Sequence, residues 1–154
     1  MEKVIKKFNF SRLNLLFMIV ITVVCGTLYL WGLDISYMFS AFIPIMAIVL
    51  FENSVVGISA AILILVFYLV SYLLSKKNKG FILLSIVLFI FDTILLGYII
   101  SLLLPAASSF GIHNVFAIGN YLGVSIAIKV VFHLWMIYQL TNATIAWMKI
   151  GREK

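Results

Sequence analysis

The chain consists of long apolar runs separated by short polar breaks. The runs cover residues 13–32, 54–74, 81–104 and 118–142. A helix of about 20 residues, at a rise of about 1.5 Å per residue, crosses the ~30 Å hydrocarbon core of a bilayer. The pattern therefore predicts an all-α integral membrane protein whose four transmembrane helices form a single membrane domain over residues 1–154.

Residues 37–51 form a shorter apolar run that is open to two interpretations. As a helix this run is about 22 Å long, which is less than the thickness of the hydrocarbon core, and Pro44 lies in its middle. If the run crosses the membrane, the chain has five spans and the Lys76–Lys79 turn lies outside. If it dips in from the outer side and returns, the chain has four spans and the turn lies inside.

The distribution of cations favours the four-span topology with one short outer re-entrant helix over 37–51. In that topology ten of the 11 Lys and Arg residues share one side, and only Lys129 lies inside a span. Cationic residues near span ends collect on the cytoplasmic side, so we expect a multi-pass protein of the cytoplasmic membrane with both termini in the cytoplasm. The ten cations are Lys3, Lys6, Lys7, Arg12, Lys76, Lys77, Lys79, Lys149, Arg152 and Lys154.

Composition excludes most soluble classes of protein. The 154 residues are 65% hydrophobic and 10% charged, with a mean hydropathy of +1.24, whereas soluble domains have about 45–50% apolar and about 25% charged residues. The net charge of +6 therefore indicates membrane orientation, and we expect the lipid bilayer, and no nucleic acid, as a partner.

Two ionisable residues are predicted deep inside the membrane. Asp92 follows Gly80 by 12 residues and Lys129 precedes Asn142 by 13, which places both about 18–20 Å from the cytoplasmic face. Each alone costs about 2.5–3.5 kcal/mol on insertion scales. We therefore expect a salt bridge or shared hydrogen bond between these residues on two antiparallel helices.

The last span carries a polar stripe. Tyr121, Ser125, Lys129 and His133 are four residues apart and share one helix face, which must point into the bundle. With Asp92 they form an intramembrane polar cluster with two interpretations. It is either a structural bridge that fixes helix register, or a proton- or ion-handling relay in which His133 titrates near neutral pH.

Small residues predict close helix contacts. Thr93, Gly97 and Ser101 form one seam, and Gly57 and Ala61 form another, because small side chains let membrane helices approach closely.

The sequence predicts no metal, cofactor-binding or catalytic residues. One His and one Asp beside a Lys cation are too few metal ligands, and the HExxH, CxxC, GxGxxG and P-loop motifs are absent. This favours a non-enzymatic protein. A lipid-headgroup enzyme stays open as a second alternative, because polar residues are available on the outer side. These are Asp34, Glu52, Asn53, His113, Asn114 and Asn120.

Three short motifs carry a resemblance to a known family. They are Phe39-Ser40-Ala41-x-x-Pro44, Asp92-Thr93-x-x-Leu96 and Phe132-His133-x-Trp135 followed by Ala146-Trp147. With them the chain resembles a family of small, uncharacterised four-helix membrane proteins of Gram-positive bacteria of the Firmicutes type, which has no assigned activity. The resemblance implies a bacterial cytoplasmic membrane and singles out Asp92 and His133, whereas Lys129 belongs to none of the motifs.

For function, the sequence favours a helper or interaction subunit of a membrane assembly, which binds a partner membrane protein. The first alternative is a small ion- or proton-coupled channel or transporter that uses Asp92, Lys129 and His133. Four short spans rarely enclose a pathway alone, so this alternative predicts a homo-oligomer.

A reporter fused at residue 78 tests the topology. We expect the cytoplasmic signal there, because the lysines of this turn belong to the cytoplasmic set. An outward signal at residue 78 would remove the four-span topology.

Overall fold

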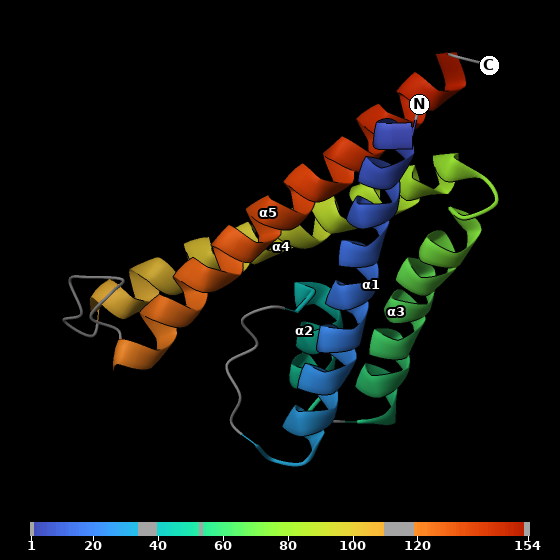
Figure 1. Ribbon diagram of the computed structural model, residues 1–154. Coiled ribbons are helices and arrows are strands. Elements are labelled where there is room, and N and C mark those ends of the chain that lie inside the picture. Colours follow the sequence, from blue (N-terminus) through green and yellow to red (C-terminus); the bar gives the residue numbers. More distant parts are fainter. Residues whose placement is uncertain (1, 34–39, 53, 110–118, 153–154) are drawn as a thin grey trace.

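The computed structural model describes residues 2–33, 40–52, 54–109 and 119–152, with side chains described outside 103–126 and 151–152. Every regular element in these ranges is helical (Figure 1), so the all-α prediction is confirmed there. The elements are α1 (Glu2–Leu30), α2 (Phe42–Leu50), α3 (Val55–Leu74), η1 (Lys79–Phe81), α4 (Ile82–Ser109) and α5 (Gly119–Arg152).

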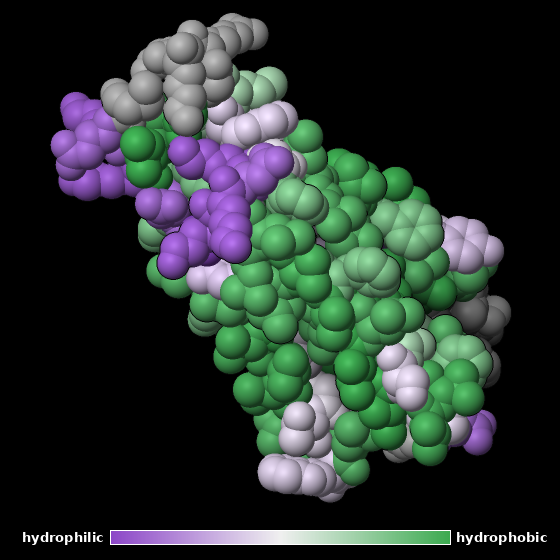
Figure 2. All heavy atoms as spheres, turned by 90° about the vertical axis from the view of Figure 1, so that its right-hand side faces the viewer, coloured by the Kyte–Doolittle hydropathy of each residue, from purple (hydrophilic) through white to green (hydrophobic). Residues whose placement is uncertain are grey.

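Three stretches of helix in the described residues are long and apolar enough to cross a membrane. They are α1, α3 and the stretch Lys79–Leu102, which joins η1 to most of α4. Figure 2 shows a largely apolar face, with strongly hydrophilic residues gathered at one end of the molecule. These features are typical of a membrane protein.

The long helices place both termini at one end. α1 packs along α5 and against α3, and α4 packs against α3 and α5. The start of α1, the turn between α3 and α4, and the end of α5 share one end of the molecule, while the far ends of α4 and α5 extend away from α1 and α3 (Figure 1).

α2 is a short helix that packs against α1, α3 and α4. It has nine residues, and Pro44 is the third of them. The sequence placed Pro44 in the middle of the run 37–51; in the structure it lies in the first turn, where a helix needs no N–H from that residue. Residues 37–39 of the predicted re-entrant run lie outside the described residues.

The last two helices extend beyond the predicted apolar runs. α4 passes the end of the run 81–104, includes Pro105 and ends at Ser109. α5 covers Gly119–Arg152 and extends beyond residue 142 of the run 118–142.

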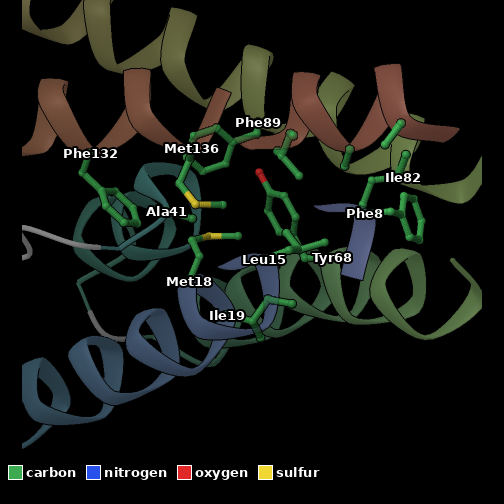
Figure 3. Packing of buried hydrophobic residues seen from close by; sticks show 13 residues of the cluster. Phe8, Leu15, Met18, Ile19, Ala41, Tyr68, Ile82, Phe89, Phe132 and Met136 are labelled. Carbon is green, nitrogen blue, oxygen red and sulfur yellow. The ribbon is translucent and has the colours of Figure 1, made fainter. Parts of the chain in front are cut away.

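The core lies where α1, α3, α4 and α5 meet. Figure 3 shows Tyr68 of α3, Phe89 of α4 and Met136 of α5 pointing into the same space as Leu15 and Met18 of α1. All five side chains are buried. The remaining members of this cluster are Phe8, Ile19, Ala41, Ile82, Phe132, Leu140, Ala143 and Ala146.

Gly57 is the point of closest approach between α2 and α3. A Cβ at this position would lie 2.6 Å from the carbonyl oxygen of Ala47 and 2.9 Å from Cβ of Phe51. Gly57 and Ala61 are both buried, so the predicted seam on this helix is confirmed. Gly97 is different, since an added Cβ would meet nothing within 4 Å; among the described residues, the close helix contact predicted for this seam is not made at Gly97.

Gly57→Ala should therefore destabilise the protein, with Gly97→Ala as the matched control. The new methyl group at position 57 meets backbone, and we expect a loss of about 1–3 kcal/mol in the free energy of unfolding. At position 97 we expect no loss and a gain of up to about 1 kcal/mol from helix propensity. Thermal or denaturant unfolding in detergent measures both, and equal effects would refute the close contact.

Candidate functional site

The Asp92 carboxylate binds the beginning of α2. Its Oδ2 accepts a hydrogen bond from the backbone N–H of Phe42 at 2.8 Å, and its Oδ1 accepts one from the N–H of Ile43 at 2.6 Å. The Asp92 side chain is 0% exposed. A residue in the middle of α4 thus caps a helix that begins 50 residues earlier.

The first turn of α2 needs such a cap because its own sequence supplies none. The N-cap residue is Ala41, whose methyl side chain accepts no hydrogen bond, and the first N–H groups of a helix have no partner within the helix. Ala41 itself donates its N–H to Thr22 Oγ1 of α1 at 2.9 Å. Pro44 has no N–H. Thr22 and Asp92 therefore satisfy every backbone N–H from Ala41 to Ile43.

His133 on α5 completes the hydrogen bonds of Asp92. Its Nε2 lies 2.9 Å from Asp92 Oδ2, and its Nδ1 lies 2.8 Å from the carbonyl oxygen of Lys129. A carbonyl only accepts, so Nδ1 carries a hydrogen and donates it. A second proton must lie between Nε2 and Oδ2, since two lone pairs would repel each other there. The Asp92–His133 pair therefore holds two protons and has no net charge.

Aromatic side chains hold the His133 ring in place. The ring stacks on Phe89 with centroids 5.0 Å apart and planes at 26°, and it meets Phe132 edge-on at 6.0 Å. His133 is 0% exposed. Low-dielectric surroundings strengthen the hydrogen bonds of the Asp92–His133 pair and make it costly to leave either partner unpaired.

The predicted cluster is assembled in part. Asp92 and His133 come together, with Asp92 Oδ2 at 2.9 Å from His133 Nε2. Lys129 contributes its backbone carbonyl to His133, and its ammonium lies 5.6 Å from the centroid of the Phe42 ring, within cation–π range. Tyr121 and Ser125 lie on α5 where side chains fall outside the described residues.

Sequence reasoning missed Thr22 and the two backbone amides. Their involvement follows from the position of the α2 start, which the apolar run 37–51 conceals. The one signal available was Pro44, because a proline is tolerated in a first helical turn and not in a helix interior. Read that way, Pro44 would have placed the helix start a few residues before it.

A small apolar cavity lies beside His133, between α4 and α5. Its volume is about 110 Å³, and its lining includes Thr93 and Gly97 of α4 and His133 and Leu134 of α5. Within the described ranges no three His, Cys, Asp or Glu side chains converge on one point. Of the outer polar residues considered for a headgroup site, Asp34, Asn53, His113 and Asn114 lie outside the described residues, as does the side chain of Asn120.

No family model, no curated protein and no solved structure matches the chain. The resemblance to the Firmicutes-type family stays a prediction. The quoted motifs nevertheless meet in space, since Ala41 and Pro44, Asp92, and His133 all belong to the start of α2 or its cap.

A double-mutant cycle tests the Asp92–His133 pair. Asp92→Asn places an amide where two N–H groups need acceptors, and we expect it to cost about 1–3 kcal/mol of unfolding free energy. Combining it with His133→Phe, which keeps a ring against Phe89, should give a coupling energy of about 1–3 kcal/mol.

The matched comparison combines Asp92→Asn with Lys129→Met. We expect a smaller coupling energy there, because the His133 imidazole lies at hydrogen-bond distance, 2.9 Å, from the Asp92 carboxylate. A larger coupling energy with Lys129 would restore the pair that the sequence suggested.

Proposed function

We propose that the protein is a non-enzymatic subunit of a membrane assembly, with four spans, α2 as a re-entrant helix from the outer side, and both termini in the cytoplasm. The location follows from the family resemblance and the charge distribution, and is a bacterial cytoplasmic membrane. One observation carries the functional part: the hydrogen bonds of Asp92 and His133 are made within the chain, and both side chains are 0% exposed.

Several features support this topology. The 34 residues of α5 exceed the roughly 20 that a span needs, and the other long helices are apolar enough to span. Both ends of the chain and the α3–α4 turn lie at one end of the molecule (Figure 1), and the sequence near these three places carries most of the lysines and arginines. α2 begins beside Asp92, which lies near the middle of α4, and ends beside the start of α3. Such a path supports the proposal that α2 enters and leaves on the same side of the membrane.

A closed polar site favours a structural role over transport. A group that relays protons or ions needs access to water or to a transported ion, whereas the hydrogen bonds of the Asp92–His133 pair are used to hold α2, α4 and α5 together. Removing an uncapped helix start from water costs several kcal/mol per N–H group. The Asp92–His133 pair removes the cost of these unpaired N–H groups. That stabilisation is sufficient reason for ionisable residues at this depth.

The surface of α4 supplies an interface for another membrane helix. Five large side chains on one face of this helix are each more than half exposed, and Gly97 beside them has open space above it. Small residues next to an apolar stripe let helices pack closely in membranes. The 110 Å³ cavity lined by Gly97 has room for a side chain of a partner helix. We call this face the α4 seam: Val87, Phe91, Ile94, Tyr98 and Leu102.

Gly97→Leu tests the assembly role. The leucine side chain would occupy the cavity that a partner fills, so we expect the complex seen by cross-linking in native membranes to be lost while thermal stability in detergent changes little. Leu63→Ala, on an exposed position of α3 away from the seam, is the control and should keep the complex.

The products of cross-linking also separate the alternatives. A defined second membrane protein cross-linked to the α4 seam supports the assembly role. Products that contain only copies of this chain contradict it and favour the oligomeric channel, as does proton flux into proteoliposomes that Asp92→Asn abolishes. The re-entrant helix that starts at a buried carboxylate is the feature that keeps this second function open, because transporters build ion sites at the ends of broken helices.

A further inference from the structure

The ends of α1 and α5 enclose a cationic cavity. α1 and α5 lie side by side at the end where the termini lie (Figure 1). The cavity has a volume of about 180 Å³, with Lys3 and Lys7 on one wall and Lys149 on the other. The Asn142 side chain also lines it. We call it the lysine cavity.

The three lysines of this cavity lack an acidic partner among the described residues. Glu2, the acid nearest in sequence to Lys3 and Lys7, pairs with Lys6 at 2.7 Å. No carboxylate of the described residues lines the cavity; Glu153, the acid nearest in sequence to Lys149, lies outside them. Three ammonium groups around one small space repel one another unless an anion lies between them. The lysine cavity therefore has the charge of an anion site.

Part of the lining of the lysine cavity is apolar. Val4, Ile145 and Ala146 contribute to it, so a small hydrated anion would leave this surface in contact with water. A molecule with an anionic group and an apolar tail covers both parts.

The same helix faces lead from the lysine cavity into an apolar groove. One face of α1 runs through residues 3, 7, 10, 17 and 21, which are three, four or seven positions apart. The facing side of α5 runs through residues 149, 145, 142, 138, 135 and 131. Further along these faces, α1 and α5 form a groove of about 770 Å³, which we call the α1–α5 groove. Between the two cavities lie Phe10 at 59% and Tyr138 at 62% exposure. The half-buried Asn14 lies on the same face of α1, and its buried Nδ2 has no hydrogen-bond partner among the described residues. The groove itself is lined by Phe17, Ile21, Ala127, Ile128, Val131, Phe132 and Trp135.

We propose that the lysine cavity and the α1–α5 groove form one binding site for an anionic phospholipid. The headgroup phosphate binds Lys3, Lys7 and Lys149, and an acyl chain lies along the groove. Basic pockets between membrane helices at headgroup level bind anionic lipids in this way. A zwitterionic headgroup fits less well, because its own cation would lie among the lysines.

Native mass spectrometry of the full-length protein in mild detergent measures the affinity, with phosphatidylglycerol and phosphatidylcholine of matched acyl chains as probes. We expect the wild type to prefer phosphatidylglycerol. The triple variant K3Q/K7Q/K149Q should lose about fivefold in affinity per lysine, or roughly 100-fold in all, if each is worth about the usual lysine contribution near an anionic surface.

The matched control is K76Q/K77Q/K79Q, which removes the same charge from the α3–α4 turn at the same end of the molecule. It should lower the affinity by less than about threefold. Equal losses in the two triple variants would mean that diffuse charge attracts the lipid, which would overturn the site.

Two further experiments distinguish a phospholipid from a free anion as the ligand. A127F places a ring in the groove without touching the lysines, and should weaken phosphatidylglycerol binding severalfold. Inorganic phosphate at millimolar concentration should not displace the lipid. If phosphate displaces it and A127F has no effect, the cavity binds a free anion and the proposal is wrong.

Discussion

The structure depends on how the first turn of α2 finds hydrogen-bond acceptors in apolar surroundings. A helix that starts within a membrane domain exposes backbone N–H groups that no water can reach, and each costs several kcal/mol if unpaired. Asp92 supplies two acceptors and Thr22 a third. His133 then binds the same carboxylate. Through this one capped turn, α1, α2, α4 and α5 are tied to each other.

The elements of the fold were predictable to the extent that they follow from length and apolarity. The runs 54–74 and 81–104 return as α3 and the span-length part of α4, and Asp92 and His133 stood out as polar residues within apolar runs. Complementary charge pointed to Lys129 and the polar stripe to His133, but nothing in the sequence indicated that the Asp92 carboxylate would bind backbone amides of α2. Amides are present at every residue, so no pattern of residue types reveals which two a carboxylate will cap.

A closed interior and open outer faces fit the proposed role as a subunit of a membrane assembly. The ionisable residues inside the helix bundle hold it together, whereas the features available to other molecules lie on its surface. The α4 seam offers an apolar face with room at Gly97, and the lysine cavity leads into the α1–α5 groove on another side. A partner helix and an anionic lipid would thus bind different helices, and neither needs the Asp92–His133 pair to open.

Amide hydrogen exchange at Phe42 and Ile43 tests the capped helix start most directly. In the wild-type protein in lipid nanodiscs both amides should be protected. In Asp92→Ala they should exchange at least about tenfold faster, since they lose their acceptors, while amides in the middle of α3 keep their protection. Equal exchange at both positions in the two proteins would show that Asp92 does not cap α2.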